Sequence, residues 1–278
     1  MQKPSIAIVG PGRAGSALGR AFHTAGYTIA AVGGRNPDNV RALADELGAR
    51  ACQTPSATVD LADLTILAVP DDVIGPLAAD MAGGLCSAAG KAVVHLSGAQ
   101  DRSPLMPLNQ QGSIRIGVFH PLQTFRRGPQ AVGNVAGTYF GIDADSPLRE
   151  QLGQLAIEVG GHPFDLAGVD RALYHAAAVF AANYPMTLLA EAITIAAEAG
   201  LDETTARPGL TTLLAGAVNN LRDLAPPDAI TGPAARGDEG TIKKHLAALK
   251  ADPAAQRLYQ LLAERTRLLA GKKKAEAA

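Results

Sequence analysis

Three glycines near the start of the chain have the spacing of a phosphate-binding turn. Gly10, Gly12 and Gly15 form the pattern G-x-G-x-x-G directly after an apolar run from Ile6 to Val9. In such a turn the first glycine permits a sharp bend, the second lets the backbone approach a pyrophosphate, and the third lets the helix pack against the strand. Free N–H groups at the start of the helix then bind the phosphate charge. The motif therefore favours dinucleotide binding over a purely structural turn.

The end of the next expected strand, over 28–32, predicts which dinucleotide is bound. An NAD-preferring site usually carries an acidic residue near this position, but here the chain has Arg35 and no acid. A guanidinium suits a 2′-phosphate and can stack on adenine, so we predict NADP, with a solvated surface arginine as the alternative. The predicted cofactor-binding residues are Gly10, Pro11, Gly12, Arg13, Ala14, Gly15, Gly34, Arg35, Asn36, Val69 and Pro70.

Two further side chains with acid–base chemistry follow predicted strands over 92–96 and 115–119. Ser97 comes directly after the first of these strands and His120 directly after the second. Ligands bind at the carboxyl ends of parallel strands, so both side chains should face the nicotinamide end of the cofactor. An imidazole is suited to proton exchange near neutral pH, and we predict that His120 does this, oriented by Ser97. The alternatives are turn-forming roles for both residues, and His95 is interpreted as a core histidine.

The order of these elements predicts an α/β fold. Strands over 6–9, 28–32, 63–69, 92–96 and 115–119 alternate with helical segments, which is typical of a doubly wound parallel sheet, and two more extended segments follow at 138–143 and 161–164. A helix is expected to begin at Asp71 and Asp72, which we interpret as N-caps, with a cofactor contact as the alternative. We place a Rossmann domain over 1–165 and an all-helical domain over 166–278.

The predicted helical domain begins with an apolar helix that carries a few polar residues. The helix over 170–199 is apolar on nearly every side, so it is expected to be buried, with Pro185 kinking it. Polar groups on a buried helix need partners, so we predict catalytic or positioning roles for His175 and Asn183 and substrate binding for Tyr184. The alternative is a hydrogen-bond network that braces the packing of the helices.

Helices over 205–221, 240–249 and 253–269 complete the domain. The loop over 229–238 between the first two is rich in glycine and proline and carries Arg236. A guanidinium binds carboxylates bidentately, so Arg236 is predicted to hold an anionic group of the substrate, whereas Asp238 is predicted to cap the next helix.

Composition limits the classes of function. The 278 residues fit two domains, and a net charge of −1 with no tryptophan argues against nucleic acid or an anionic membrane as partner. Cys52 and Cys86 lack metal-ligand spacing, so we expect no metal site and a cytoplasmic protein. We see no targeting segment and expect no membrane span.

Four motifs together resemble a known bacterial family. They are Gly10-Pro-Gly12-Arg-Ala-Gly15, Phe119-His120-Pro-Leu-Gln-Thr-Phe125, Tyr174-His175 with Ala181-Ala-Asn183-Tyr184, and Thr231-Gly-Pro-Ala-Ala-Arg236-Gly-Asp238. They are similar to Rossmann-like proteins with a C-terminal domain of unknown function 2520, related to 6-phosphogluconate dehydrogenases and pyrroline-5-carboxylate reductases. The resemblance implies NADP binding, a helical C-terminal domain and a homodimer. Ser97, His120, His175 and Arg236 also resemble the site of prephenate dehydrogenases, although the turn after Pro121 departs from that enzyme.

We therefore predict an NADP-dependent oxidoreductase that transfers hydride to or from a small carbonyl, imine or hydroxy compound. A non-catalytic NADP-binding sensor or scaffold is one alternative, since the long helix has no lysine to match the catalytic lysine of β-hydroxyacid dehydrogenases. Hydride exchange with a second cofactor, a flavin or deazaflavin, is the other.

Overall fold

The chain divides into two structural units, and the boundary between them lies within one long helix. The computed structural model describes residues 3–84, 90–109, 114–126, 128 and 133–276, and Cys86 lies outside these ranges. Residues 1–182 form the first unit and residues 183–278 the second. The sequence placed the domain boundary earlier, after Asp165. The division falls later because the first turns of the long helix bond to the sheet of the first unit through Arg171 and Tyr174.

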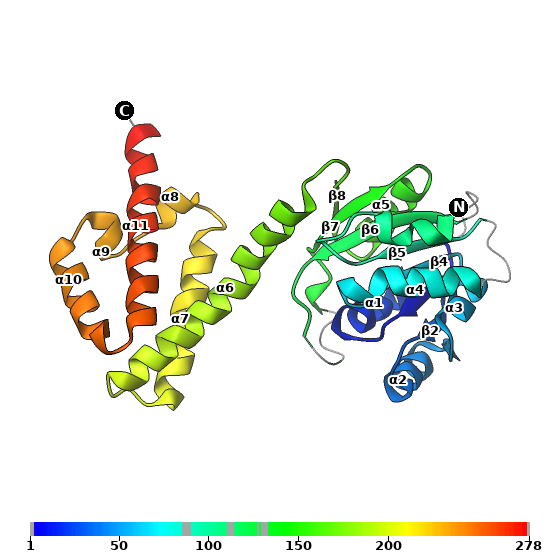
Figure 1. The fold of residues 1–278 in the computed structure, drawn as a ribbon, viewed down its shortest axis with the longest axis horizontal. Helices are drawn as coiled ribbons and strands as arrows, with labels where there is room; N and C mark the ends of the chain where they lie inside the picture. Colours follow the sequence, from blue (N-terminus) through cyan, green and yellow to red (C-terminus); the bar gives the residue numbers. More distant parts are fainter. Residues whose placement is uncertain (1–2, 85–89, 110–113, 127, 129–132, 277–278) are drawn as a thin grey trace. The chain divides into compact units, whose positions relative to one another are not determined.

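The first unit alternates strands and helices (Figure 1). Its elements are β1 (Ile6–Val9), α1 (Arg13–Thr24), β2 (Ile29–Gly33), α2 (Pro37–Leu47), β3 (Arg50–Cys52), α3 (Pro55–Leu61), β4 (Leu64–Leu67), α4 (Asp71–Gly83), β5 (Ala92–His95), the 3₁₀ helix η1 (Ser103–Asn109), β6 (Arg115–Leu122), β7 (Tyr139–Ala144), α5 (Leu148–Glu158), β8 (His162–Asp165) and the start of α6 (Arg171–Glu198).

The strands form one sheet in the order β3-β2-β1-β4-β5-β6-β7-β8. Every described neighbouring pair is parallel except β6 and β7, which are antiparallel. Val9 at the end of β1 pairs with Gly33 in β2 and with Leu67 in β4, and Leu67 pairs with His95 in β5. This register brings the carboxyl ends of four strands to the same edge of the sheet, where ligands bind in such folds.

Helices cover both faces of the sheet, as a doubly wound fold requires. One buried cluster, which includes Leu18 and Leu43, joins the sheet to α1, α2 and α5. The other, which includes Ile74 and Leu105, joins it to α3, α4 and η1. Strands that are buried on both faces read as continuous apolar runs, which is why the sequence predicted them well.

The structure differs from the sequence-based expectation at several short elements. Strand β3 and helix α3 were not predicted, because a three-residue strand with two exposed residues and a seven-residue helix carry almost no periodic signal. Strand β6 runs on to Leu122, so His120 lies within the strand, opposite Gly141 of β7. The expected N-caps Asp71 and Asp72 are instead in the first turn of α4, whose N-cap is Pro70.

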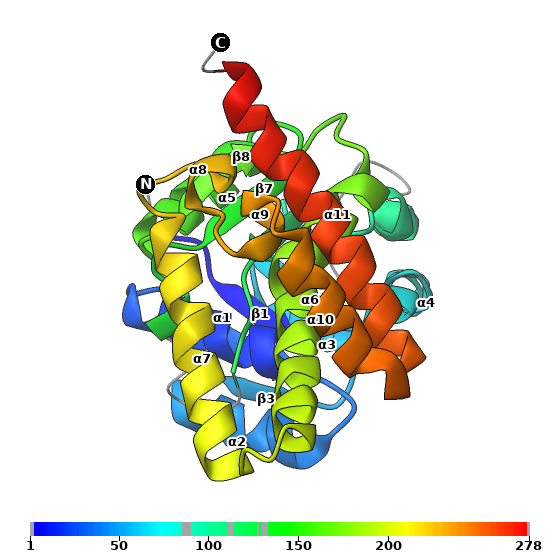
Figure 2. The same ribbon diagram turned by 90° about the vertical axis from the view of Figure 1, so that its left-hand side faces the viewer.

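The regular elements described in the second unit are all helices. They are the remainder of α6, α7 (Glu203–Asn220), α8 (Pro226–Ala229), α9 (Pro233–Arg236), α10 (Glu239–Ala248), the 3₁₀ helix η3 (Leu249–Ala251) and α11 (Pro253–Glu276). Helices α8, α9 and α10 pack beside α11 (Figure 2). The segment expected as a loop over 229–238 thus contains the short helix α9, while Asp238 caps α10 as predicted, because its Oδ1 accepts the N–H of Thr241 at 3.0 Å.

The apolar helix α6 is not buried within the chain, contrary to the expectation from its composition. It continues through Pro185, and none of its residues is buried, with Leu173 71% exposed and Met186 58% exposed. The helix has 28 residues and a stretch of mean hydropathy 1.3, so by length and composition it is the one described helix that could cross a membrane. The sequence reading had not identified it as such. A single helix of this kind is weak evidence of a membrane span, because the core helices of soluble proteins have the same properties.

Candidate functional site

The glycine turn has the geometry that a bound pyrophosphate requires. Gly10 has φ of +96°, and a Cβ there would stand 2.4 Å from the carbonyl oxygen of Ala68. A Cβ on Gly15 would stand 2.2 Å from the carbonyl oxygen of Gly10, so both positions accept only glycine. By contrast, a Cβ on Gly12 would meet no atom within 4 Å. Gly12 is the N-cap of α1 and offers no side chain to its first turn, which leaves that turn open to an anion.

A cavity of about 790 Å³ lies beside this turn, within the first unit. It brings together residues from the ends of β1, β2 and β4, as the register of the sheet dictates. Eight predicted cofactor residues line it: Gly10, Pro11, Gly12, Gly34, Arg35, Asn36, Val69 and Pro70. The cavity is large enough for a sizeable part of a dinucleotide, so the residues present fit such a cofactor.

The remaining predicted cofactor residues lie around the same turn. Arg13 lines an adjacent cavity of about 370 Å³, together with Arg126, which the sequence analysis did not select. Ala14 and Gly15 line neither cavity and belong to the first turn of α1. The Asn36 side chain caps α2 by accepting the N–H groups of Asp38 and Asn39, both at 3.0 Å.

Sequence reasoning did not select eight of the residues that line the larger cavity. They are Val9, Pro37, Asn39, Gln53, Pro55, Ala68, Val73 and Leu77. Gln53 and Pro55 follow β3, which was not predicted, so no signal pointed to them. Val73 and Leu77 lie four positions apart on α4, and their spacing on a helix that starts at the sheet edge could have identified them.

His120 is held by a residue that the sequence analysis had not selected as its partner. Its Nδ1 lies 2.7 Å from the hydroxyl of Tyr174, and the two rings are nearly perpendicular at 85°. We expected Ser97 to orient His120. Instead, the Ser97 hydroxyl accepts the N–H groups of Ala99 and Gln100, both at 3.1 Å, which is turn chemistry.

The loop after β5 shapes the other side of the His120 ring. A Cβ on Gly98 would stand 2.7 Å from Nε2 of His120, so this glycine makes room for the imidazole. His95 is fully buried; its Nε2 lies 2.7 Å from the carbonyl oxygen of Asp101, and its Nδ1 accepts the N–H of Ser97 at 3.2 Å. The interpretation of His95 as a satisfied core histidine is confirmed.

Burial and nearby cations keep the imidazole of His120 neutral. Its pKa is lowered to about 4, first by desolvation and then by the charges of His175 and Arg171, while Asp71 opposes the shift. The structure thus brings His175 into the electrostatic environment of His120, although the side chain of His175 itself is exposed.

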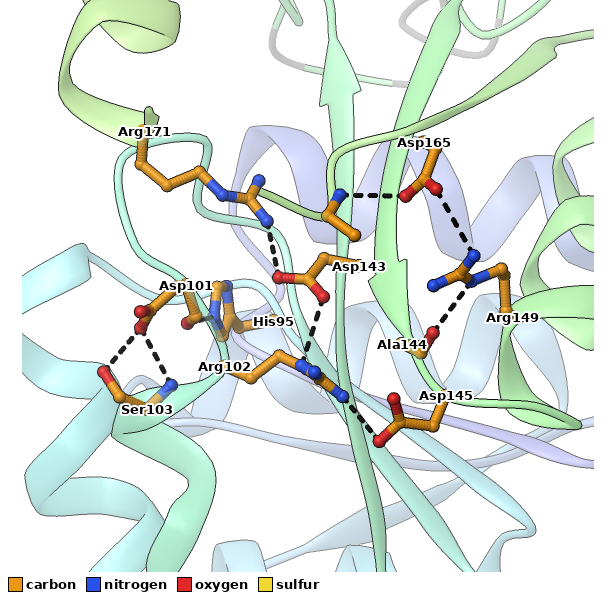
Figure 3. A network of polar contacts seen from close by, with 11 residues as sticks. His95, Asp101, Arg102, Ser103, Asp143, Ala144, Asp145, Arg149, Asp165 and Arg171 are labelled. Atoms are coloured by element: carbon orange, nitrogen blue, oxygen red, sulfur yellow. Dashed lines mark hydrogen bonds and ion pairs between the residues drawn. The ribbon is translucent and has the colours of Figure 1, made fainter. Parts of the chain in front are cut away.

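A network of ion pairs fixes the start of α6 to the sheet edge (Figure 3). Asp143 of β7 accepts a hydrogen bond from Nη2 of Arg171 at 2.7 Å and forms an ion pair with Nε of Arg102 at 3.1 Å. Arg102 also donates to Asp145 at 2.7 Å. The side chains of Asp143 and Arg171 are only 11% and 9% exposed, and Nη1 of Arg171 is buried without a hydrogen-bond partner among the described residues. Asp143 is therefore the main counter-charge for Arg171.

Replacing Asp143 with asparagine is expected to lower the free energy of unfolding by about 3 kcal/mol, because it leaves a buried cation without its counter-charge. Denaturant unfolding of the whole chain measures this. The matched control is Asp38→Asn, which breaks an exposed pair with Arg41 and should cost little. Equal losses in the two variants would contradict a structural role for the network.

Three predicted substrate residues belong to the second unit. Asn183 and Tyr184 lie on α6, and Arg236 is the last residue of α9, with its side chain exposed. Their roles toward a substrate stay predictions. Among the described residues, no group of three His, Cys, Asp or Glu side chains is placed to hold a metal ion.

The comparisons with known proteins agree with this architecture. Residues 1–121 match the family model of a Rossmann-like domain, and residues 138–266 match that of the domain of unknown function 2520. No curated protein matches the sequence significantly. The chain therefore combines these two domains, and the resemblance identified from its motifs is confirmed.

Three solved structures share the fold over nearly the whole chain. A candidate NADP oxidoreductase from Bacteroides fragilis is 27% identical, with a TM-score of 0.77 over 95% of this chain and 98% of that chain. A pyrroline-5-carboxylate reductase from Coxiella burnetii is 17% identical, with a TM-score of 0.62 over 96% and 99%. A reductive aminase from Aspergillus terreus, solved with NADPH, is 18% identical, with a TM-score of 0.66 over 95% and 93%. Fold, glycine turn and neighbours place the protein with the NAD(P)-dependent oxidoreductases.

Proposed function

We propose that the protein uses NADPH to reduce a carbon–nitrogen or carbon–oxygen double bond in a small substrate. The observation that carries this proposal is the single cavity that joins the open glycine turn to Arg35, in the unit that also holds His120. The C. burnetii enzyme is named as a reductase of pyrroline-5-carboxylate, a cyclic imine, and the A. terreus enzyme as a reductive aminase, which makes cyclic imines the first compounds to test.

The residues around the cavity would bind the cofactor in a defined order. The glycine turn and the start of α1 would hold the pyrophosphate, and Arg35 would bind the 2′-phosphate of the adenosine ribose. Val69 and Pro70, at the end of β4, would contact the cofactor further along the sheet edge. Bound NADPH would supply the hydride.

The residues predicted to act on the substrate would have separate roles. His120 would exchange a proton with the oxygen or nitrogen of the reduced bond, and His175 would lie beside it. Asn183 and Tyr184 would position the substrate, while Arg236 would bind an anionic group such as a carboxylate.

Arg35→Ala should weaken NADPH binding by roughly 10²-fold, about 2.7 kcal/mol, and leave NADH binding nearly unchanged. The reason is that only NADPH carries the phosphate that the guanidinium would bind. Titration of nicotinamide fluorescence measures both affinities. Arg41→Ala is the matched control, because Arg41 bonds to Asp38 and lines neither cavity of the glycine turn. Equal losses for the two cofactors would contradict the phosphate contact.

We also propose that the protein is a homodimer that covers α6 and α7. Large apolar side chains on these helices are exposed in the single chain, including Leu173, Met186, Leu213 and Val218. Exposed apolar surface on this scale marks an interaction site, and a second copy presents the same surface in return.

Light scattering on the purified protein tests this proposal. A dimer at micromolar concentration is expected, and Leu213→Glu should convert it to monomers by placing a charge on the covered surface. Ile157→Glu on α5 of the first unit, a similarly exposed apolar residue, is the control and should stay dimeric. A wild-type protein that is a stable monomer, or that needs detergent to stay in solution, would contradict the proposal.

A further inference from the structure

The hydrogen bond between His120 and Tyr174 links the sheet to the first turn of α6. The distance from Nδ1 to the hydroxyl oxygen is 2.7 Å, and the ring centroids are 5.4 Å apart. Arg171 precedes Tyr174 by one helical turn and is bonded to Asp143 of β7. Residues three apart share one face of a helix, so the Arg171 ion pair holds the phenol in place against the imidazole.

The protonation state of His120 determines what the hydrogen bond with Tyr174 can contribute to proton transfer. The titratable groups that act on it are His175 and Arg171 of α6, Asp71 of α4 and His95 of β5, and burial is the largest cause that lowers its pKa to about 4. At neutral pH the ring is therefore neutral and carries only one N–H. An imidazolium is not present to protonate a substrate, so the proton that His120 gives up must be replaced from a neighbour.

The neighbour at Nδ1 is a protonated phenol. Burial raises the pKa of Tyr174, while the charge of Arg171 opposes this effect. The phenol is thus a hydrogen-bond donor at neutral pH, and the lone pair of an imidazole nitrogen is the natural acceptor for it. Donation from Tyr174 to Nδ1 leaves the ring proton on Nε2, on the side that faces Gly98.

We propose that Tyr174 is a positioning residue that fixes the Nε2–H tautomer of His120 and replaces the proton that His120 gives to the substrate. This inference rests on the proposed reductase function. Bound NADPH would supply hydride to the substrate carbon, and the oxygen or nitrogen bonded to that carbon would take the proton of Nε2. As the Nε2–H bond breaks, the O–H bond of Tyr174 breaks and an Nδ1–H bond forms. Nε2 then takes a proton from water, which leaves hydroxide, as the Nδ1 proton returns to the phenolate oxygen and restores the Nε2–H tautomer; both side chains are only partly buried.

The chain contains a matched pair for comparison. His245 and Tyr259 in the second unit have the same arrangement, with Nδ1 2.7 Å from the hydroxyl, centroids 5.6 Å apart and rings at 86°. This pair is exposed and lies outside the described cavities. Replacing Tyr259 with phenylalanine therefore removes an equivalent hydrogen bond without affecting His120.

The first experiment measures imidazole nitrogen chemical shifts by NMR in histidine-labelled full-length protein, with the His120 signals assigned from a His120→Asn variant. We expect His120 to be neutral with its proton on Nε2 at neutral pH. Tyr174→Phe should redistribute that proton between the two nitrogens, and Tyr259→Phe should leave His120 unchanged. A proton on Nδ1 in the wild type, or no change in Tyr174→Phe, would overturn the inference. The readout needs neither cofactor nor substrate, so it is independent of whether the proposed function holds.

The second experiment measures the pH dependence of NADPH oxidation with the best substrate from a panel of cyclic imines and carbonyls. Tyr174→Phe should lower kcat by roughly 10²-fold at neutral pH without changing NADPH affinity, and its rate should recover roughly tenfold for each unit that the pH falls, as imidazolium replaces the relay. A loss that is equal at every pH indicates a merely structural role and would overturn the relay. If no compound oxidises NADPH, the proposed function fails and the relay with it, whatever tautomer NMR finds.

Discussion

Gly12→Val is expected to weaken cofactor binding severely while the protein remains folded. A side chain at this position meets no protein atom within 4 Å, and the backbone of Gly12, with φ of −81°, is accessible to valine. The new isopropyl group would occupy the space through which the backbone approaches the pyrophosphate. We expect a loss of roughly 10³-fold in NADPH affinity, about 4.1 kcal/mol, with little change in Tm.

Gly10→Val supplies the contrast that makes this result specific. There the Cβ would lie 2.4 Å from the backbone oxygen of Ala68, at a φ of +96° that side chains rarely adopt. We therefore expect the main effect of this variant to be a lower Tm, in contrast to the loss of NADPH affinity in Gly12→Val. Fluorescence titration and thermal unfolding of both variants separate the two effects. Normal NADPH affinity in folded Gly12→Val would show that the cofactor does not lie on this turn.

His120→Asn should reduce turnover by roughly 10²- to 10⁴-fold and leave NADPH affinity nearly intact, the loss typical of a general acid or base. The side chain is held by Tyr174 and does not line the cofactor cavity, so its removal should not affect the first binding step. Steady-state kinetics together with a cofactor titration test this expectation.

His23→Asn is the control for this variant, because His23 is an exposed residue at the end of α1. It should behave as the wild type in both assays. Parallel losses of turnover and NADPH affinity in His120→Asn would point instead to a structural role for the imidazole.

The fold could be predicted largely from the sequence, because its signals are local. Buried parallel strands leave uninterrupted apolar runs such as Ile6–Val9, and the glycine spacing identifies the strand-to-helix turn. The elements that were missed, β3 and α3, are too short for periodicity to be visible. The exposure of α6 could not be predicted, since composition shows that a helix is apolar but not which surface, if any, packs against it.

The site could be predicted only in part, because its contacts join distant residues. Arg35 and the glycine turn were found from motifs, and the parallel register then brings them to one cavity. The partner of His120 is 54 positions away in the chain, so its identity depends on how α6 meets the sheet. The link between Asp143 and Arg171 is likewise a product of tertiary packing.

Single-turnover oxidation of stoichiometrically bound NADPH tests the claim that the protein transfers hydride from NADPH held at the glycine turn. The measurement follows the loss of nicotinamide absorbance after mixing with cyclic imines, 1-pyrroline-5-carboxylate included, and with small carbonyl compounds. We expect wild type to oxidise the cofactor with at least one of these compounds, His120→Asn to do so far more slowly, and Gly12→Val to bind too little NADPH to give a signal. NADPH that binds tightly to wild type but is never oxidised would contradict the claim and favour a nucleotide sensor.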